Sequence, residues 1–168
     1  MSRATAQRTV SEEERAALAP FVQQSVELSR ARVAEGGIPF AGLVLREGRV
    51  LGEGVNRVRE ERDATAHAEV VALRQAAARH GLYATAGAVL IASGEPCGLC
   101  YLAARHFGIA HIVHAADRHT AARYGFDYRG TYAAFAQDPA SWPLTVTALP
   151  VPGAEQPFID HLEQNGQI

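Results

Sequence analysis

Cysteine is scarce in this chain, which holds only two among its 168 residues. A chain of this length can bury an apolar core large enough to fold without cross-links, so no disulfide framework is needed. No stretch approaches the roughly 20 apolar residues of a membrane helix, and we expect no membrane span. Residues 1–15 hold no apolar run beside positive charge. We therefore expect no signal peptide and a cytoplasmic protein with reduced thiols.

An excess of charge of either sign is also missing. The formal net charge is −2, the pI is about 6.4, and 48% of the residues are hydrophobic against 20% charged. This composition is typical of a globular protein, and it argues against a broad nucleic-acid-binding surface. The sequence has no internal repeats, low-complexity tracts or long linkers, which predicts a single domain over residues 1–168.

Hydrophobic patterning predicts alternating helices and strands, and hence a layered α/β domain. Ser11 and Glu14 have the spacing of a capping box before a helix that ends at Gly36. Short apolar runs bounded by turn residues predict strands. The expected strands are 40–45, 50–55, 88–93, 109–115 and 144–149, and the further expected helices are 67–80, 97–107, 117–124 and 153–164.

The two cysteines lie in residues 94–100, GEPCGLC, between a predicted strand and a predicted helix. Proline favours a first helical turn, where Cys97 and Cys100, three residues apart, share one helix face. The helix dipole lowers the pKa of a thiol at such a position. The spacing fits a thioredoxin-type redox pair, two inert buried thiols, or two ligands of a metal site. Two sulfurs alone do not complete a tetrahedral zinc site.

A candidate third ligand lies 30 residues upstream, in DATAHAEVVALRQA (63–76). Asp63 and Thr65 are the expected caps of a helix whose first turn holds His67 and Glu69. Side chains in a first turn tilt past the helix N-terminus, so two facing helix N-termini bring His67 and the two cysteines around one metal ion. Three protein ligands leave a fourth position for water, which is typical of a catalytic zinc site.

The combined pattern H-x-E and P-C-x-x-C is the signature of zinc-dependent nucleobase deaminases. The chain resembles the cytidine deaminase-like superfamily, in the branch of guanine deaminase, fungal cytosine deaminase and bacterial tRNA adenosine deaminases. The resemblance runs from about Ile38 to Tyr132 and includes IPFAGLVL, GEGVNR, ATAHAEVVAL, GEPCGLC and YGFDYRGTY. It implies a three-layer α/β/α sandwich with a central mixed sheet of about five strands, and one zinc ion per chain.

The resemblance also implies roles for individual residues. Glu69 would move protons between the zinc-activated water and a substrate that loses ammonia. Asn56 and the backbone N–H of Ala68 would bind the base, and Asp127 would contact its far edge. Phe40 and Phe107 are candidate pocket walls.

The stretch YGFDYRGTY is similar to the GFD segment of guanine deaminases, so a guanine-like free base is the first expected substrate. Tyr128 and Arg129 stand where those enzymes usually carry another acidic residue. Cytosine, isocytosine, a triazine, a pterin or a nucleoside therefore stays open. A tRNA substrate is less expected, because no Lys/Arg cluster is present. Two hypotheses outside deamination also stay open: an inactive zinc scaffold, against which the intact Glu69 argues, and a thiol redox protein.

Besides the small-molecule substrate and water, we expect a second copy of the chain as partner. Related enzymes pair through helices beside the active site, and the helix 97–107 with Leu99, Ala103 and Phe107 suits such packing. Residues 140–168 supply a C-terminal strand and helix that are suited to cover the pocket or a subunit interface. We expect neither a membrane nor a nucleic acid as partner.

Overall fold

The structure is a computed structural model that describes residues 10–165. The chain divides into two compact units, residues 1–136 and 137–168, and each unit is described by itself. The first unit holds the sheet and all the predicted site residues. Among residues 10–165, no helix is both long and apolar enough to cross a lipid bilayer.

The first unit is built on a four-stranded mixed sheet in the order β2-β1-β3-β4. Strand β1 pairs antiparallel with β2 and with β3, and β3 pairs parallel with β4. A two-residue turn, Glu47-Gly48, joins β1 to β2, and both residues have positive φ (50° and 73°), which matches the twist of a hairpin. The strands are β1 (Ala41–Arg46), β2 (Arg49–Val55), β3 (Val89–Gly94) and β4 (His111–Ala116).

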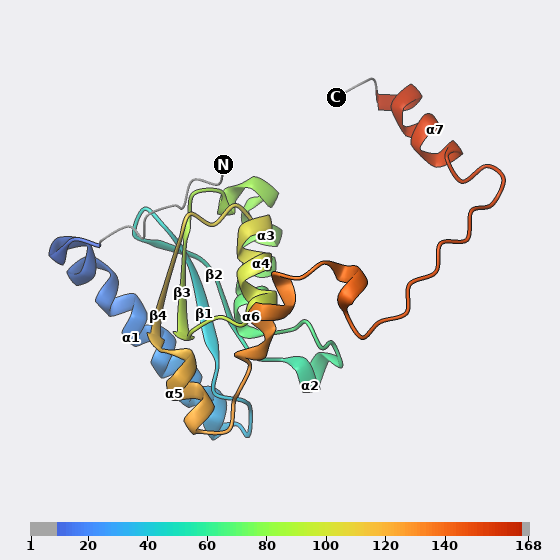
Figure 1. Cartoon of the computed structure of the whole chain (residues 1–168). Helices are drawn as coiled ribbons and strands as arrows, with labels where there is room; N and C mark the ends of the chain where they lie inside the picture. Colours follow the sequence, from blue (N-terminus) through green and yellow to red (C-terminus); the bar gives the residue numbers. More distant parts are fainter. Residues whose placement is uncertain (1–9, 166–168) are drawn as a thin grey trace. The chain divides into compact units, whose positions relative to one another are not determined.

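Helices cover both faces of this sheet and make three layers (Figure 1). On β1, Leu43 and Leu45 pack against α1 (Glu12–Ala34). Val44 lies on the opposite face, in a cluster with residues of α3 (Ala68–His80) and α4 (Gly98–His106). The α/β/α sandwich that the sequence predicts is therefore confirmed.

The remaining elements of the first unit are short. They are α2 (Val58–Glu61), the 3-10 helix η1 (Leu82–Thr85), α5 (Arg118–Arg123) and α6 (Gly130–Phe135). The second unit holds the 3-10 helix η2 (Pro139–Ser141) and α7 (Gln156–Asn165).

The prediction of a fifth strand over residues 144–149 is wrong. Residues 144–149 alternate apolar and polar side chains, but they are irregular in the structure, and the described sheet has four strands. Strand propensity depends on packing against a neighbouring strand, and Leu144, Val146 and Leu149 are 64–82% exposed. The last helix forms as expected but begins at Gln156, because Gly153 has a φ of +79° that no α-helix accommodates.

One further expectation needs correction. Asp63 and Thr65 do not cap α3; Thr65 donates its N–H and its hydroxyl to Asp63 Oδ1 in a turn that precedes the helix, and His67 is the N-cap. The helix face with Leu99, Ala103 and Phe107 is partly buried against the core of its own subunit. These three side chains are only half-buried, and their part in a subunit contact stays a prediction.

Helix α3 packs unusually close to β2, because the contact is made by small residues. Gly52 and Gly54 on the strand face Ala68, Ala72 and Ala76 on the helix. A Cβ atom on Gly54 would lie 2.6 Å from the Ala72 amide nitrogen and against the Ala68 carbonyl oxygen. Backbone atoms cannot move aside alone, so the glycines fix how near the N-terminus of α3 lies to the sheet.

We predict that Gly54→Ala destabilises the fold, because the added methyl group pushes α3 off the sheet. Overpacking of this kind costs about 1–3 kcal/mol in the free energy of unfolding, measurable by chemical denaturation. Gly130→Ala is the matched control, since a Cβ there meets no described heavy atom within 4 Å. Equal stability of the two variants would contradict the close packing.

Candidate active site

Two helix N-termini deliver the three metal-ligand candidates. His67 is the N-cap of α3 and Cys97 is the N-cap of α4, and both have extended backbone conformations. Most N-cap side chains bond to the first turn of their own helix, but neither of these does. Their side chains therefore remain available to project beyond the helix ends, as the sequence predicts.

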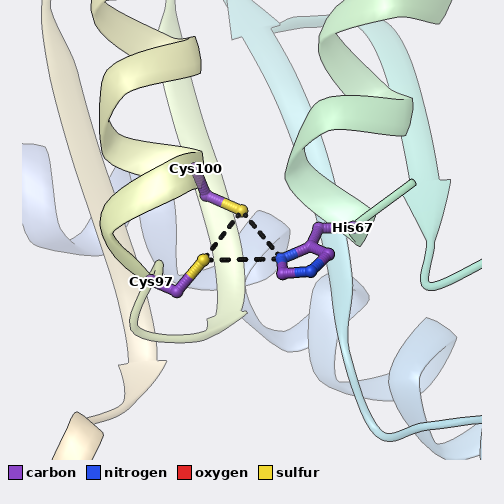
Figure 2. A group of neighbouring side chains, drawn as sticks. All are labelled: His67, Cys97 and Cys100. Atoms are coloured by element: carbon purple, nitrogen blue, oxygen red, sulfur yellow. Dashed lines mark hydrogen bonds between the residues drawn. The ribbon is translucent and has the colours of Figure 1, made fainter. Parts of the chain in front are cut away.

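The three donor atoms form a small triangle (Figure 2). Nδ1 of His67 lies 3.4 Å from each sulfur, and Sγ of Cys97 lies 3.6 Å from Sγ of Cys100. A tetrahedral zinc ion holds two sulfurs about 3.8 Å apart and a sulfur and a nitrogen about 3.5 Å apart, given its usual bond lengths. The donor set fits zinc in both chemistry and spacing.

The pKa values of the two thiols are shifted in opposite directions. The hydrogen bond between them lowers the pKa of Cys97 to about 4, with a further contribution from the His67 ring. The same bond and burial raise the pKa of Cys100. The bond with Cys97 raises the pKa of His67. Cysteine binds zinc as the thiolate, so binding of the ion would release the protons that the two thiols hold.

Glu69 lies beside this triangle and is only 4% exposed. The Cys100 thiol donates to its Oε2 over 3.4 Å, and burial raises the pKa of the Glu69 carboxyl group. A buried carboxyl group with a raised pKa is suited to take up and release protons.

A cavity of about 340 Å³ is lined in part by Glu69 and the three metal-ligand candidates. Its volume is at the small end of the range of small-molecule pockets, roughly 300–1,000 Å³. The predicted contacts Phe40, Asn56, Ala68 and Asp127 all line it. The Asn56 side chain is held by Val58, whose N–H donates to Oδ1 over 3.3 Å. The structure thus brings together segments that the sequence separates widely.

Phe107 does not reach the cavity. It is the C-cap of α4, about 14 Å along the nine-residue helix from Cys97, and it packs against the core cluster of α3 and α4. The prediction that Phe107 forms part of the pocket wall is therefore wrong, and its side chain packs in the core.

Asp127 reaches the cavity, but it already has a partner. Nε and Nη2 of Arg129 donate to its carboxylate over 2.8 and 2.7 Å, and this pairing lowers the pKa of Asp127 to about 2. Asp127 is therefore an ionised acceptor with a guanidinium group at its side.

Sequence reasoning assigned no place in the site to several residues that support it. Arg32 of α1 is buried, and its Nε donates to the Asn56 carbonyl oxygen over 3.0 Å. Glu95 accepts from the Arg118 backbone and guanidinium group, and Tyr128 lines the cavity. Arginine is common in the last turn of a helix, so nothing in the sequence marks Arg32 as a residue that supports the site. Tyr128 lies inside the stretch YGFDYRGTY, where its position next to Asp127 was a usable signal.

Comparison with known proteins agrees with this geometry. Residues 16–116 match the family described as the cytidine and deoxycytidylate deaminase zinc-binding region. Guanine deaminase of Bacillus subtilis is 36% identical over 108 residues, which cover 64% of this chain and 69% of that protein. The X-ray structure of a guanine deaminase from the same species superposes with a TM-score of 0.78 at 27% identity, covering 89% of this chain and 96% of the other.

Two further similarities bear on the substrate. A solved structure in complex with 2,6-diaminopurine is 34% identical, covers 71% of this chain and 64% of its own, and has a TM-score of 0.59. A tRNA-specific adenosine deaminase of Streptococcus pyogenes is 27% identical over 97 residues, covering 58% of this chain and 61% of that protein.

The match to the family spans more than half of the chain and includes the His67, Cys97 and Cys100 triangle and Glu69. The sandwich around these residues has the fold of the similar solved structures. The chain belongs to the cytidine and deoxycytidylate deaminase zinc-binding family, within the cytidine deaminase-like superfamily of hydrolases that act on C–N bonds.

Proposed function

We propose that this protein catalyses the zinc-dependent hydrolytic deamination of a free nucleobase, with a guanine-like base as first candidate. The observation that carries the proposal is the His67, Cys97 and Cys100 triangle beside the buried Glu69 in one small cavity. The similarity to guanine deaminase of Bacillus subtilis supports the choice of base. The cytoplasm, where thiols stay reduced, is the compartment that suits two cysteine ligands.

In this proposal each residue has a distinct task. A zinc ion held by His67, Cys97 and Cys100 supplies Lewis acidity that brings the pKa of a water toward neutrality. Glu69 takes the water proton and gives it to the ring nitrogen beside the amino-bearing carbon. Glu69 would then take the remaining proton from the hydroxyl group on the attacked carbon and deliver it to the departing amine, so that water and the amino base become ammonia and the oxo base. The low exposure of Glu69 keeps these transfers away from bulk solvent.

The other cavity residues orient the base in our proposal. The carboxamide group of Asn56 and the N–H of Ala68 bond to ring heteroatoms, and Phe40 packs against the ring face. The ionised Asp127 accepts from N–H donors at the far edge. Guanine-like rings present such donors, and this is the second reason for placing them before cytosine, isocytosine and other amino-heterocycles.

Three different functions have weaker support. Deamination of tRNA adenosine rests on the lower similarity to the Streptococcus pyogenes enzyme, and a net charge of −2 does not favour binding of a nucleic acid. A redox pair leaves the contacts of His67 with both sulfurs unexplained. An inactive zinc scaffold has no use for a buried proton carrier at position 69.

We predict that the purified protein contains about one zinc ion per chain and that Cys97→Ser and His67→Ala lose most of it. Chelation lowers the melting temperature, because binding of the ion is linked to the native state. Elemental analysis and thermal unfolding measure these effects. His106→Ala, on the exposed last turn of α4, is the control and keeps its zinc. Zinc-free wild-type protein with a titratable disulfide would instead support a redox function.

We predict that the wild-type enzyme releases ammonia from guanine in a panel of free bases, nucleosides and nucleotides. Glu69→Gln keeps zinc and fold but lowers kcat by at least about 10²–10⁴, the usual contribution of general acid–base catalysis. Ammonia release and zinc content are measured on the same samples. Near-normal activity of the variant, or no release from any heterocyclic amine by the wild type, contradicts the proposed function.

The same panel resolves the role of Asp127. Asp127→Ala lowers kcat/KM for guanine roughly 10–100-fold, the value of one hydrogen bond to a charged group, and less for bases without N–H donors at that edge. Arg129→Ala serves as its control, because it breaks the ion pair but keeps the carboxylate. Equal losses for every substrate would make Asp127 a structural residue of its turn.

We also propose that the chain forms a homodimer and that residues 140–168 contribute to the interface between the two copies. None of the described side chains in residues 137–165 is buried, and such a set of exposed apolar groups is typical of an interaction site. The exposed apolar residues of this unit are Leu144, Val146, Leu149, Val151, Phe158, Ile159 and Leu162.

For this proposal we predict a dimer in light scattering at micromolar concentration. Replacing Phe158 and Leu162 of α7 by Asp shifts the protein toward monomer, because charged groups cannot be buried there without partners. Gln164→Glu, a charge change at an exposed position of the same helix, leaves the mass unchanged. A monomeric wild type refutes the proposal.

A further inference from the structure

The loop that carries Cys97 has few backbone contacts of its own. Residues 95–97 are irregular, between the end of β3 and the start of α4. The Glu95 N–H donates to the Ala116 carbonyl oxygen, and the Cys97 carbonyl oxygen accepts from Tyr101 within α4. The Glu95 and Pro96 carbonyl oxygens and the Gly98 N–H then need partners from elsewhere, because unpaired backbone groups are costly when buried.

One segment supplies all three partners. The Tyr128 hydroxyl donates to the Glu95 carbonyl oxygen and the Tyr132 hydroxyl to the Pro96 carbonyl oxygen, each over 2.6 Å. The Gly98 N–H donates to the Thr131 hydroxyl over 3.0 Å. We call these three residues the hydroxyl clamp. Their spacing of i, i+3 and i+4 places them on one side of the turn that opens α6.

Thr131 has a specific task in the clamp. The N-cap residue of α4, Cys97, makes no capping bond, so the Gly98 N–H is one of the donors that a helix start leaves free. The Thr131 hydroxyl accepts from this N–H while it donates to the Tyr128 carbonyl oxygen over 2.7 Å. A side chain of α6 thereby pairs a backbone N–H that the start of α4 leaves free.

Neighbouring residues also pack against Tyr132 of the clamp. The Arg118 guanidinium group lies 4.0 Å from the centroid of the Tyr132 ring and is paired with Glu95. Tyr132 also makes edge contacts with the rings of Tyr101 and Tyr128. Gly98 allows close approach, since a Cβ there would collide with the Phe135 ring. These contacts fix the Tyr132 hydroxyl directly against the residue that precedes Cys97.

We propose that the hydroxyl clamp positions Cys97 for zinc, and that Tyr132 is its main positioning residue. Pro96 is fully buried, so loss of the Tyr132 hydroxyl leaves a buried carbonyl oxygen without its partner and frees the loop to move Cys97 away from His67 and Cys100. Tyr132 lies outside the cavity lining and is therefore a positioning residue that does not touch the substrate. The inference rests on the proposed zinc site.

The test compares zinc affinity in wild type, Tyr132→Phe and Tyr83→Phe by competition with a chromophoric chelator. Tyr83 is 83% exposed in η1 and serves as the control. We expect Tyr132→Phe to weaken zinc binding about 10-fold or more, as for other residues that support metal ligands, and Tyr83→Phe to have no effect. Thr131→Val weakens binding in the same direction, and Thr131→Ser, which keeps the hydroxyl, restores it.

A merely structural role gives a different result. In that case the Tyr132→Phe melting temperature falls equally with and without zinc, whereas a positioning role reduces the stabilisation that zinc adds. Wild-type affinity in Tyr132→Phe, with zinc present in the wild type, overturns this inference and leaves the proposed function standing. A wild-type protein without zinc overturns both.

Discussion

The close contact between α3 and β2 sets the position of the whole candidate site. Because glycines on the strand face alanines on the helix, α3 lies nearer to the sheet than larger side chains would allow. Its N-terminus then meets that of α4, and His67 Nδ1 comes within 3.4 Å of both sulfurs. A shift of an ångström in either helix would open this triangle, since ligand distances in zinc sites vary by only about 0.2 Å.

The same arrangement sets the electrostatics of the site. Helix N-termini favour negative charge, and here they face two sulfurs and a carboxyl group in a buried space. The hydrogen bond between the two thiols lowers the pKa of Cys97 and raises that of Cys100. Burial keeps the Glu69 pKa raised. The donor set suits a dication, and in our proposal Glu69 carries the protons.

In our proposal, the residues that carry the chemistry and the residues that select the base come from different parts of the chain. His67, Glu69 and the cysteines start helices on the sheet, which is a rigid support. Asp127 follows α5 in a loop and is tied to Arg129. Loop residues vary more freely than core helices. On our proposal, a change in this loop alters the choice of base and leaves the zinc ligands in place.

Local patterns in the sequence determined a large part of this protein. The capping box of α1, the hairpin of β1 and β2, the helices 67–80 and 97–107, and the ligand types at positions 67, 97 and 100 all rest on residues close together in the chain. Only the tertiary structure decided the rest. The irregular residues 144–149, the core place of Phe107, the buried bond of Arg32 to Asn56 and the clamp on Cys97 depend on segments far apart in sequence. A strand forms only where a neighbouring strand pairs with it, and a side-chain contact forms only where the fold brings the second residue close.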